Sequence, residues 1–184
     1  MECLWAGWRI PAMRADRATV EESHLTSSGT AATTQKSDQT LFDAILASGL
    51  PDDQTYIVWC SELVCVLLNR YPYTVGHVLV IPCRAVDQLE DLDQTEYIAL
   101  WEAVQHSVIA IKTAFSPDGI NLGANIGKGA GPSVTNHLHI HVVPRWKSDT
   151  NFMSAVANVR VLPRTLQDTW KSLRESWPTD ATVN

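Results

Sequence analysis

The sequence lacks several features that would assign a protein to a class at once. It has only four cysteines, Cys3, Cys60, Cys65 and Cys83, and none of them forms a C-x-x-C pair. This argues against a disulfide framework and favours a reducing cytoplasm. The cysteines are then expected to behave as small hydrophobic residues. No apolar run approaches the roughly 18–20 residues of a membrane span, and the first residues lack a basic start followed by an apolar run. We therefore expect a cytoplasmic protein without a membrane segment or a signal peptide.

An excess of positive charge is also missing. Lys and Arg number 14 against 20 Asp and Glu, so the formal net charge is −6. Such a chain is not expected to hold nucleic acid by general electrostatics, although a local pocket can still bind a small anion. The 184 residues are 45% hydrophobic, which suits one globular domain. The polar stretch at about 21–39 predicts a flexible loop.

The pattern of apolar residues predicts an α+β domain. Helices are expected at 37–49, at 96–115 after a capping box of Asp93 and Glu96, and at the C-terminal end, about 163–178. Strands are expected at 55–60, 63–72, 76–82, 119–127 and 136–144. The long helix is expected to have an apolar stripe of Tyr97, Trp101, Val104, Val108, Ile111 and Phe115. These elements predict a mainly antiparallel sheet.

Half of the six histidines fall within the last predicted strand, at His137, His139 and His141. Side chains at alternate positions of a strand share a face and lie roughly 7 Å apart. The residues between and after them, Leu138, Ile140 and Val142, are aliphatic and are expected to face a core. Solubility alone does not explain such a row, since Ser, Thr, Lys or Glu would serve equally well.

Two chemistries can use three imidazoles on one face. Histidine is the commonest metal ligand, but no carboxylate or cysteine pair is spaced to complete a site. A neutral imidazole can instead attack phosphorus and form a covalent intermediate. The Gly-rich segment just upstream favours this second reading, because glycines let backbone amides approach phosphate oxygens, while Lys128 can add charge and Ser133 a hydroxyl. Gly131 belongs to the same loop.

The segment HLHIHVV resembles the signature of the histidine triad, or HIT, superfamily. NRYPYTVGHVLVIP, at 69–82, resembles the other signature segment of that family. LWAGWRI, INLGANIG and HVVPRWKSDTNFM are similar to the branch of bacterial diadenosine tetraphosphate phosphorylases and fragile histidine triad hydrolases. The resemblance implies a HIT-like fold with a five-stranded antiparallel sheet, two main helices and, here, a C-terminal helical extension, as one domain over 1–184.

The resemblance also implies roles for single residues. It makes His139 the nucleophile, with His137 and His141 orienting it and contacting phosphate or leaving group, and His77 as the fourth histidine beside the triad. Substrate contacts are implied along the rest of the site, at Asn69, Asn125, Ser133 and Trp146, together with the loop residues Lys128 and Gly131. The remaining histidine of the long helix, His106, is expected to be structural.

Two positions depart from the family pattern. Many bacterial members hold a structural zinc with an N-terminal C-x-x-C, a histidine after the third strand and one triad histidine. This chain has no C-x-x-C and carries Ala85 at the second position, so we expect no zinc and no required cofactor, although a divalent cation can accompany the nucleotide. Pro132 stands in the phosphate loop, where it removes a backbone N–H.

The resulting hypothesis is an enzyme that cleaves the α-phosphate linkage of a dinucleoside polyphosphate or related nucleotide through a nucleotidyl-histidine. Phosphate or water would accept the nucleotide, which corresponds to a phosphorylase or a hydrolase. A phosphorylase needs a second anion pocket, for which Lys128, Arg145 and Lys147 are candidates. The alternatives are a nucleotide-binding regulatory protein with little turnover, which Pro132 keeps open, and a metal-binding protein. We expect a homodimer or a higher homo-oligomer.

Overall fold

A computed structural model describes residues 39–131, 134, 136–147, 149 and 161–179, which fall in one compact unit. The polar stretch at 21–39 lies outside these residues apart from Gln39, so its flexibility stays a prediction, as does a single domain over the whole chain. Within the described residues no helix is long and apolar enough to cross a membrane.

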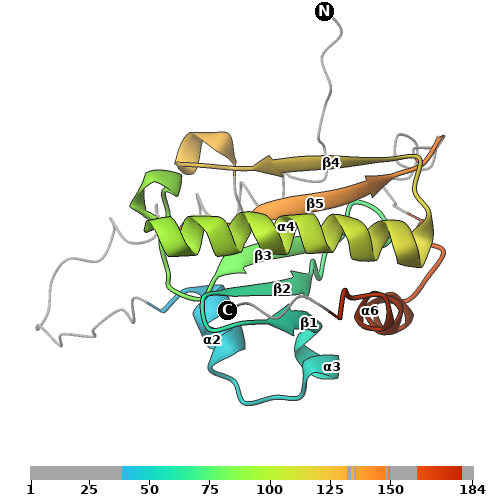
Figure 1. The fold of residues 1–184 in the computed structure, drawn as a ribbon, viewed down its shortest axis with the longest axis horizontal. Coiled ribbons are helices and arrows are strands. Elements are labelled where there is room, and N and C mark those ends of the chain that lie inside the picture. The colour runs from blue at the N-terminus through green and yellow to red at the C-terminus, as the bar shows by residue number, and fades with distance from the viewer. Residues whose placement is uncertain (1–38, 132–133, 135, 148, 150–160, 180–184) are drawn as a thin grey trace, which may run out of the picture. The chain divides into compact units, whose positions relative to one another are not determined.

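Five antiparallel strands form a single sheet in the order β1-β2-β3-β5-β4 (Figure 1). The strands are β1 Ile57–Cys60, β2 Val64–Leu68, β3 Val78–Pro82, β4 Gly119–Ala124 and β5 Ile140–Arg145. This arrangement confirms the predicted α+β class and the mainly antiparallel sheet. β2 is shorter than predicted because the side chain of Asn69 accepts the N–H of Tyr71 at 2.9 Å and turns the chain there.

The long helix α4, Gln94–Phe115, packs on one face of the sheet (Figure 1). Its predicted capping box is confirmed, because Asp93 accepts the N–H groups of Thr95 and Glu96 while Glu96 accepts that of Asp93. Its buried face differs in part from the predicted stripe and is built largely of small and aliphatic residues: Ala99, Leu100, Ala103, Val104, Ser107, Ala110 and Ile111. The prediction was wrong for Tyr97 and Trp101, which are exposed, because the face packed in the core contains Ala99 and Ala103 instead.

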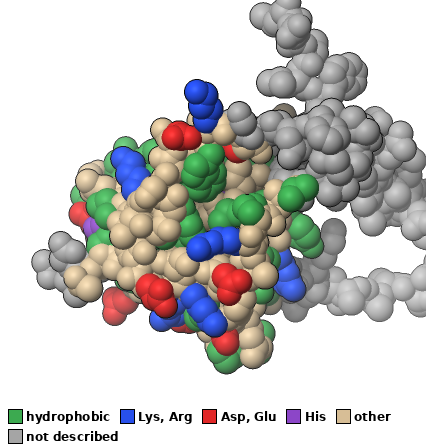
Figure 2. Space-filling model, turned by 90° about the vertical axis from the view of Figure 1, so that its right-hand side faces the viewer, with side chains coloured by type: hydrophobic (Ala, Val, Ile, Leu, Met, Phe, Trp, Pro, Cys, Tyr) green, Lys and Arg blue, Asp and Glu red, His purple; other side chains and the backbone are tan. Residues whose placement is uncertain are grey.

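The predicted C-terminal helix is present as α6, Leu166–Glu175. It buries Leu173, and the indole N–H of Trp170 donates to the carbonyl of Ile57 at 2.7 Å. Trp177, just after the helix, stacks on Trp59 and also lies beside His106, whose Nδ1 is buried without a hydrogen-bond partner. The side of the molecule that includes α6 carries acidic and basic side chains interspersed with apolar ones (Figure 2).

The opposite face of the sheet carries the short helix α2, Leu41–Leu46. Phe42 is its buried residue and packs in a second apolar cluster that contains Cys65, Leu67, Leu79 and Ile81. The predicted helix was longer, and three short helical segments were not predicted, α3 at Asp52–Thr55, η2 at Leu89–Asp91 and η3 at Lys128–Ala130. α2 therefore gives this face of the sheet its own small core, and the histidine segment borders it.

The cysteines depart from the expectation of free, small hydrophobic residues. Cys60 and Cys65 form a disulfide, because the register of β1 and β2 places them directly opposite one another. Cys83 is a free thiol whose Sγ lies 3.9 Å from Sγ of Cys65. Burial raises the pKa of the Cys83 thiol.

Candidate functional site

The histidine segment enters the sheet later than predicted. β5 begins at Ile140, so His137 and His139 precede the strand and only His141 belongs to it. Before that point the chain is held by the segment after β3, since the N–H of Leu138 donates to the carbonyl of Val86 at 2.6 Å. The predicted alternation still holds, because Leu138, Ile140 and Val142 lie in the core beneath α4.

The imidazole face is more closed than a solvated or half-buried face. His137 and His139 are 2% and 4% exposed, and His141 is half-buried. The ring of Phe42 contacts both of the buried imidazoles, with ring centroids 5.2 Å from His137 and 5.5 Å from His139. Phe42 of helix α2 thus helps to bury His137 and His139, a contribution that its sequence did not reveal.

The hydrogen bonds of His139 define which of its nitrogens can react. Its Nδ1 lies 2.8 Å from the main-chain oxygen of His137. A carbonyl oxygen only accepts, so Nδ1 must carry the hydrogen, and in the neutral ring Nε2 keeps its lone pair. Burial lowers the pKa of His139, the neighbouring His137 lowers it further, and the hydrogen bond to the His137 carbonyl opposes this in part. The site therefore favours a neutral imidazole whose Nε2 carries no hydrogen.

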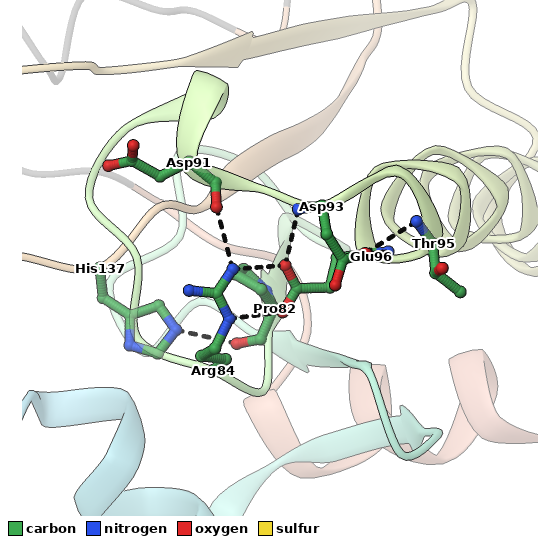
Figure 3. A network of polar contacts seen from close by, with 7 residues as sticks. All are labelled: Pro82, Arg84, Asp91, Asp93, Thr95, Glu96 and His137. Atoms are coloured by element: carbon green, nitrogen blue, oxygen red, sulfur yellow. Dashed lines mark hydrogen bonds and ion pairs between the residues drawn. The ribbon is translucent and has the colours of Figure 1, made fainter.

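His137 has protein partners for both ring nitrogens. Its Nε2 lies 2.8 Å from the carbonyl oxygen of Pro82 (Figure 3). Its Nδ1 lies 2.8 Å from Oγ1 of Thr40. Nε2 must donate to the carbonyl, so in the neutral ring Nδ1 accepts the Thr40 hydroxyl. This arrangement suits the orienting part of its expected role rather than direct contact with a phosphate.

His77 and His141 form a directed chain of hydrogen bonds. The main-chain N–H of Tyr73 donates to Nδ1 of His77 at 3.0 Å, so Nε2 of His77 carries the hydrogen of the neutral ring. That Nε2 lies 2.9 Å from Nδ1 of His141. A neutral His141 consequently holds its own hydrogen on Nε2, where it can be donated to a bound group. The ring of Tyr73 stacks on both histidines, with centroids 4.8 Å and 6.0 Å away.

Gly76 allows His77 to reach this position. Its backbone has φ +80°, in the left-handed region that favours glycine. A Cβ there would also lie 2.8 Å from the ring of Phe115, at the end of α4. Both the conformation and the space therefore call for glycine immediately before the buried His77.

The other predicted site residues are placed unevenly. Asn69 lies beside His77, with Nδ2 3.4 Å from its Nδ1. Asn125 directly follows Ala124, whose partner in the ladder is Ile140, the residue after His139. Gly131 is exposed with φ +73°, and Lys128 opens the turn η3, Lys128–Ala130, its side chain outside the described part. Ser133 and Pro132 also lie outside the described residues.

The candidates for a second anion pocket lie near the end of β5. Arg145 is already engaged, donating to both carboxylate oxygens of Asp149 at 2.6 and 2.8 Å and to Oδ1 of Asn121 at 2.9 Å. Trp146 is partly buried, and its N–H donates to the same Asp149. Lys147 is exposed. Arg145 therefore holds the segment after β5 in place rather than presenting an uncompensated charge.

A polar network fixes the segment that carries the carbonyl of Pro82. Arg84 donates to both carboxylate oxygens of Glu96 at 2.7 and 2.6 Å and to the carbonyl of Asp91 at 2.9 Å (Figure 3). The hydrogen bond from Arg84 lowers the pKa of the Glu96 carboxyl, and the cap hydrogen bond from Asp93 acts in the same direction against its burial. Apart from the Asp93–Glu96 capping box, no sequence pattern predicted this network, because its partners come from separate elements.

The described residues contain no group of three or more His, Cys, Asp or Glu side chains that could hold a metal ion. Around His137, hydrogen bonds to Thr40 and Pro82 occupy the imidazole nitrogens instead. The absence of a structural zinc from the protein as a whole stays a prediction.

The chain resembles known proteins in both sequence and structure. It is 41% identical over 128 residues to the AP-4-A phosphorylase of Mycobacterium tuberculosis, an alignment that covers 70% of this chain and 66% of the relative, just under two thirds of its length. It is 40% identical over 96 residues to the bis(5'-adenosyl)-triphosphatase of Dictyostelium discoideum, covering 52% of this chain and 64% of that one.

Among solved structures, a Zn-bound histidine triad family protein from Mycobacterium smegmatis superposes with a TM-score of 0.59 at 31% identity, covering 74% of this chain and 91% of the other. The family model of the HIT domain matches residues 52–148, which include β1 to β5, His77 and the triad. By its histidine geometry, its sheet and this match, the chain belongs to the HIT family.

Proposed function

We propose that this protein is an enzyme that cleaves a dinucleoside polyphosphate, or a related nucleotide, at its α-phosphate. Nε2 of His139 attacks the α-phosphorus, the bond from phosphorus to the bridging oxygen breaks, and the remaining polyphosphate leaves with the electron pair. Phosphate or water then attacks the same phosphorus, the P–N bond breaks, and His139 returns to its neutral form. The names of the mycobacterial and Dictyostelium relatives support this substrate class.

One observation carries the proposal, the hydrogen bond from Nδ1 of His139 to the carbonyl of His137. It fixes the tautomer whose Nε2 is unprotonated and therefore nucleophilic. The lowered pKa of His139 keeps the neutral form populated at neutral pH.

The chain of hydrogen bonds through His77 supports a matching role for His141. Because Nδ1 of His141 accepts from His77, its Nε2–H can donate to the oxygen that develops charge as the leaving group departs. The His139 and His141 rings lie close together, with centroids 5.0 Å apart, so donor and nucleophile can reach the same phosphate. The remaining predicted contacts, Asn69, Asn125, Lys128, Gly131, Ser133 and Trp146, are proposed to bind the nucleotide around this pair.

Turnover of diadenosine tetraphosphate with and without inorganic phosphate tests the proposal. A phosphorylase yields ADP and ATP only when phosphate is present, whereas a hydrolase yields AMP and ATP in either condition. Binding without either product set would contradict the enzymatic proposal and support the regulatory alternative. Elemental analysis of the same preparation separates both from a metal-binding protein.

We also propose that the protein is a homodimer. β4 is an edge strand of the sheet, and Leu122 on it is 50% exposed. Helix α4 carries Ile98, Trp101 and Ile109 at 46%, 39% and 44% exposure, spaced along one side of the helix. Exposed large apolar residues on one helix face and, among the described residues, an edge strand are features of an interaction surface.

A further inference from the structure

The first residues of the described chain contact the triad, although nothing in the histidine motif points to them. Thr40 caps helix α2, and its hydroxyl accepts the N–H of Asp43 at 3.1 Å, while Asp43 accepts the N–H of Thr40 at 2.8 Å. The same Oγ1 lies 2.8 Å from Nδ1 of His137, 97 residues away in the sequence. This helix cap is therefore shared with the catalytic segment.

We propose that Thr40 and Asp43 are positioning residues that hold His137 and, through its main-chain carbonyl, fix the tautomer of His139. The proposal adds detail to the proposed function. Only its turnover measurements depend on that function.

The hydrogen-bonding capacity of Thr40 supports this assignment. Its oxygen accepts the N–H of Asp43, so its single hydroxyl hydrogen remains to be donated to the neutral His137 ring. Thr40 is 4% exposed, and the His137 side chain is fully buried, so water does not compete for this bond. Removing the hydroxyl would leave a buried imidazole nitrogen without a partner, which costs more than a lost surface contact.

Asp43 adds charge at the same point. Its Oδ1 lies 3.9 Å from Nδ1 of His137. Burial raises the pKa of the Asp43 carboxyl, but the hydrogen bond from the N–H of Thr40, with further contributions from the Thr40 side chain and from His137, outweighs it, so that the pKa is lowered overall. The carboxylate is thus ionised at neutral pH and places a negative charge beside the His137 ring.

The coupling to the nucleophile passes through one peptide group. His137 is held on one side by Thr40 and on the other by the carbonyl of Pro82. Its own carbonyl accepts from Nδ1 of His139, so a displaced His137 ring would move the acceptor that selects the His139 tautomer. Phe42, between Thr40 and Asp43, contacts both imidazoles and transmits any shift of α2 to them.

The full-length Thr40→Val variant tests the proposal, with Thr40→Ser as the variant that keeps the hydroxyl. Thr165→Val is the matched control. Thr165 caps α6 in the same way, because its Oγ1 accepts the N–H of Asp168 at 3.1 Å. It forms no hydrogen bond to His77 or to the three triad histidines. Two quantities are measured: the tautomer of His139 from its imidazole nitrogen chemical shifts, and kcat and KM for diadenosine tetraphosphate.

We expect Thr40→Val to lower kcat by about tenfold with KM nearly unchanged, by analogy with the loss of outer partners of ligating histidines. It should also mix the His139 tautomers, while Thr40→Ser and Thr165→Val resemble the wild type. A Thr40→Val protein that matches Thr165→Val in both quantities would overturn the proposal. The nitrogen shifts need no turnover, so the tautomer result stands even if the proposed activity is absent.

Asp43→Asn keeps the test decisive if Thr40→Val does not fold. Asparagine retains an acceptor for the N–H of Thr40 but removes the charge beside His137. We expect a change in the nitrogen shifts of His137 and a kcat lowered severalfold, by less than in Thr40→Val. Unchanged shifts and an unchanged kcat in Asp43→Asn would also refute the assignment.

Discussion

Nε2 of His77 lies 2.9 Å from Nδ1 of His141, and the direction of this bond is set by the backbone of Tyr73. Because Nδ1 of His77 accepts the N–H of Tyr73, His77 can only donate to His141. The buried His77 therefore decides where His141 carries its hydrogen. His77, which orients His141 in this way, lies outside the row formed by His137, His139 and His141.

The ring of Tyr73 should matter because it stacks on both histidines of this pair. We expect Tyr73→Leu to lower kcat by about tenfold, in the range found when outer partners of functional histidines are lost. Tyr71→Leu is the control, since Tyr71 is 82% exposed in the same turn. Steady-state kinetics of both variants check the difference, and equal effects would argue against a role for the stacked ring.

His139 itself should be indispensable for turnover. We expect His139→Ala to abolish it while nucleotide binding persists, and His139→Gly to regain activity with free imidazole, which can enter the vacated space. Individual alanine substitutions of His137 and His141 should each cost less, about 10²–10³-fold by analogy with oxyanion donors. An acid-labile, base-stable phosphoramidate should be detectable in the wild type with labelled nucleotide. Near-normal turnover of His139→Ala would show that another group is the nucleophile.

The pH dependence of the nucleophile should reflect its burial. The pKa of His139 lies below the ordinary value of about 6.5, so the single-turnover rate should stay high as the pH falls through 6.5 and decline only lower. An acid limb at or above the ordinary value would contradict this expectation.

The same shift affects stability. The pKa of His139 is lower in the folded protein than in the unfolded chain. At pH values between these two pKa values the unfolded chain binds more protons than the folded protein, so the free energy of unfolding decreases as the pH falls through this range. Above the unfolded-state value this contribution is constant. Urea titrations at several pH values measure the free energy of unfolding. Its change with pH in this range should be smaller for His139→Gln than for the wild type.

The disulfide between Cys60 and Cys65 should be found in protein purified without reductant. Trypsin cuts after Lys36 and Arg70, so both cysteines fall in the peptide 37–70. That peptide should be about 2 Da lighter than its reduced form, because forming the bond removes two hydrogens. Reduction should lower the free energy of unfolding by about 2 kcal/mol for so short a loop. A fully reduced mass under oxidising conditions would rule the bond out.

The proposed dimer should depend on the exposed side of α4. Trp101→Asp places a charge in the middle of that apolar surface and should yield a monomer by light scattering at micromolar concentration. Leu50→Asp is the control, because Leu50 is 54% exposed in the loop between α2 and α3. A monomeric wild type, or a dimeric Trp101→Asp, would exclude this interface.

The sequence was sufficient for the features that depend on local pattern. Alternation of His and aliphatic residues at 137–142 predicted one polar and one core-facing side, and the Asp93–Glu96 cap marked the start of α4. Both follow from backbone geometry, since side-chain period and cap hydrogen bonds involve residues only a few positions apart. The five strands could be read in the same way, whereas the family was indicated by the resemblance of the two signature segments.

Tertiary structure decided what distant residues do to one another. The buried side of α4 contains Ala99 and Ala103 while Tyr97 and Trp101 are exposed, and packing against the sheet decides this, which hydrophobic periodicity does not contain. The Cys60–Cys65 bond required the register of two strands. The state of the triad is likewise set from outside its motif, by Thr40 and Pro82 around His137 and by Tyr73 behind His77. A hydrogen bond chooses a tautomer by the position of its partner in space, and only the folded chain brings these partners together.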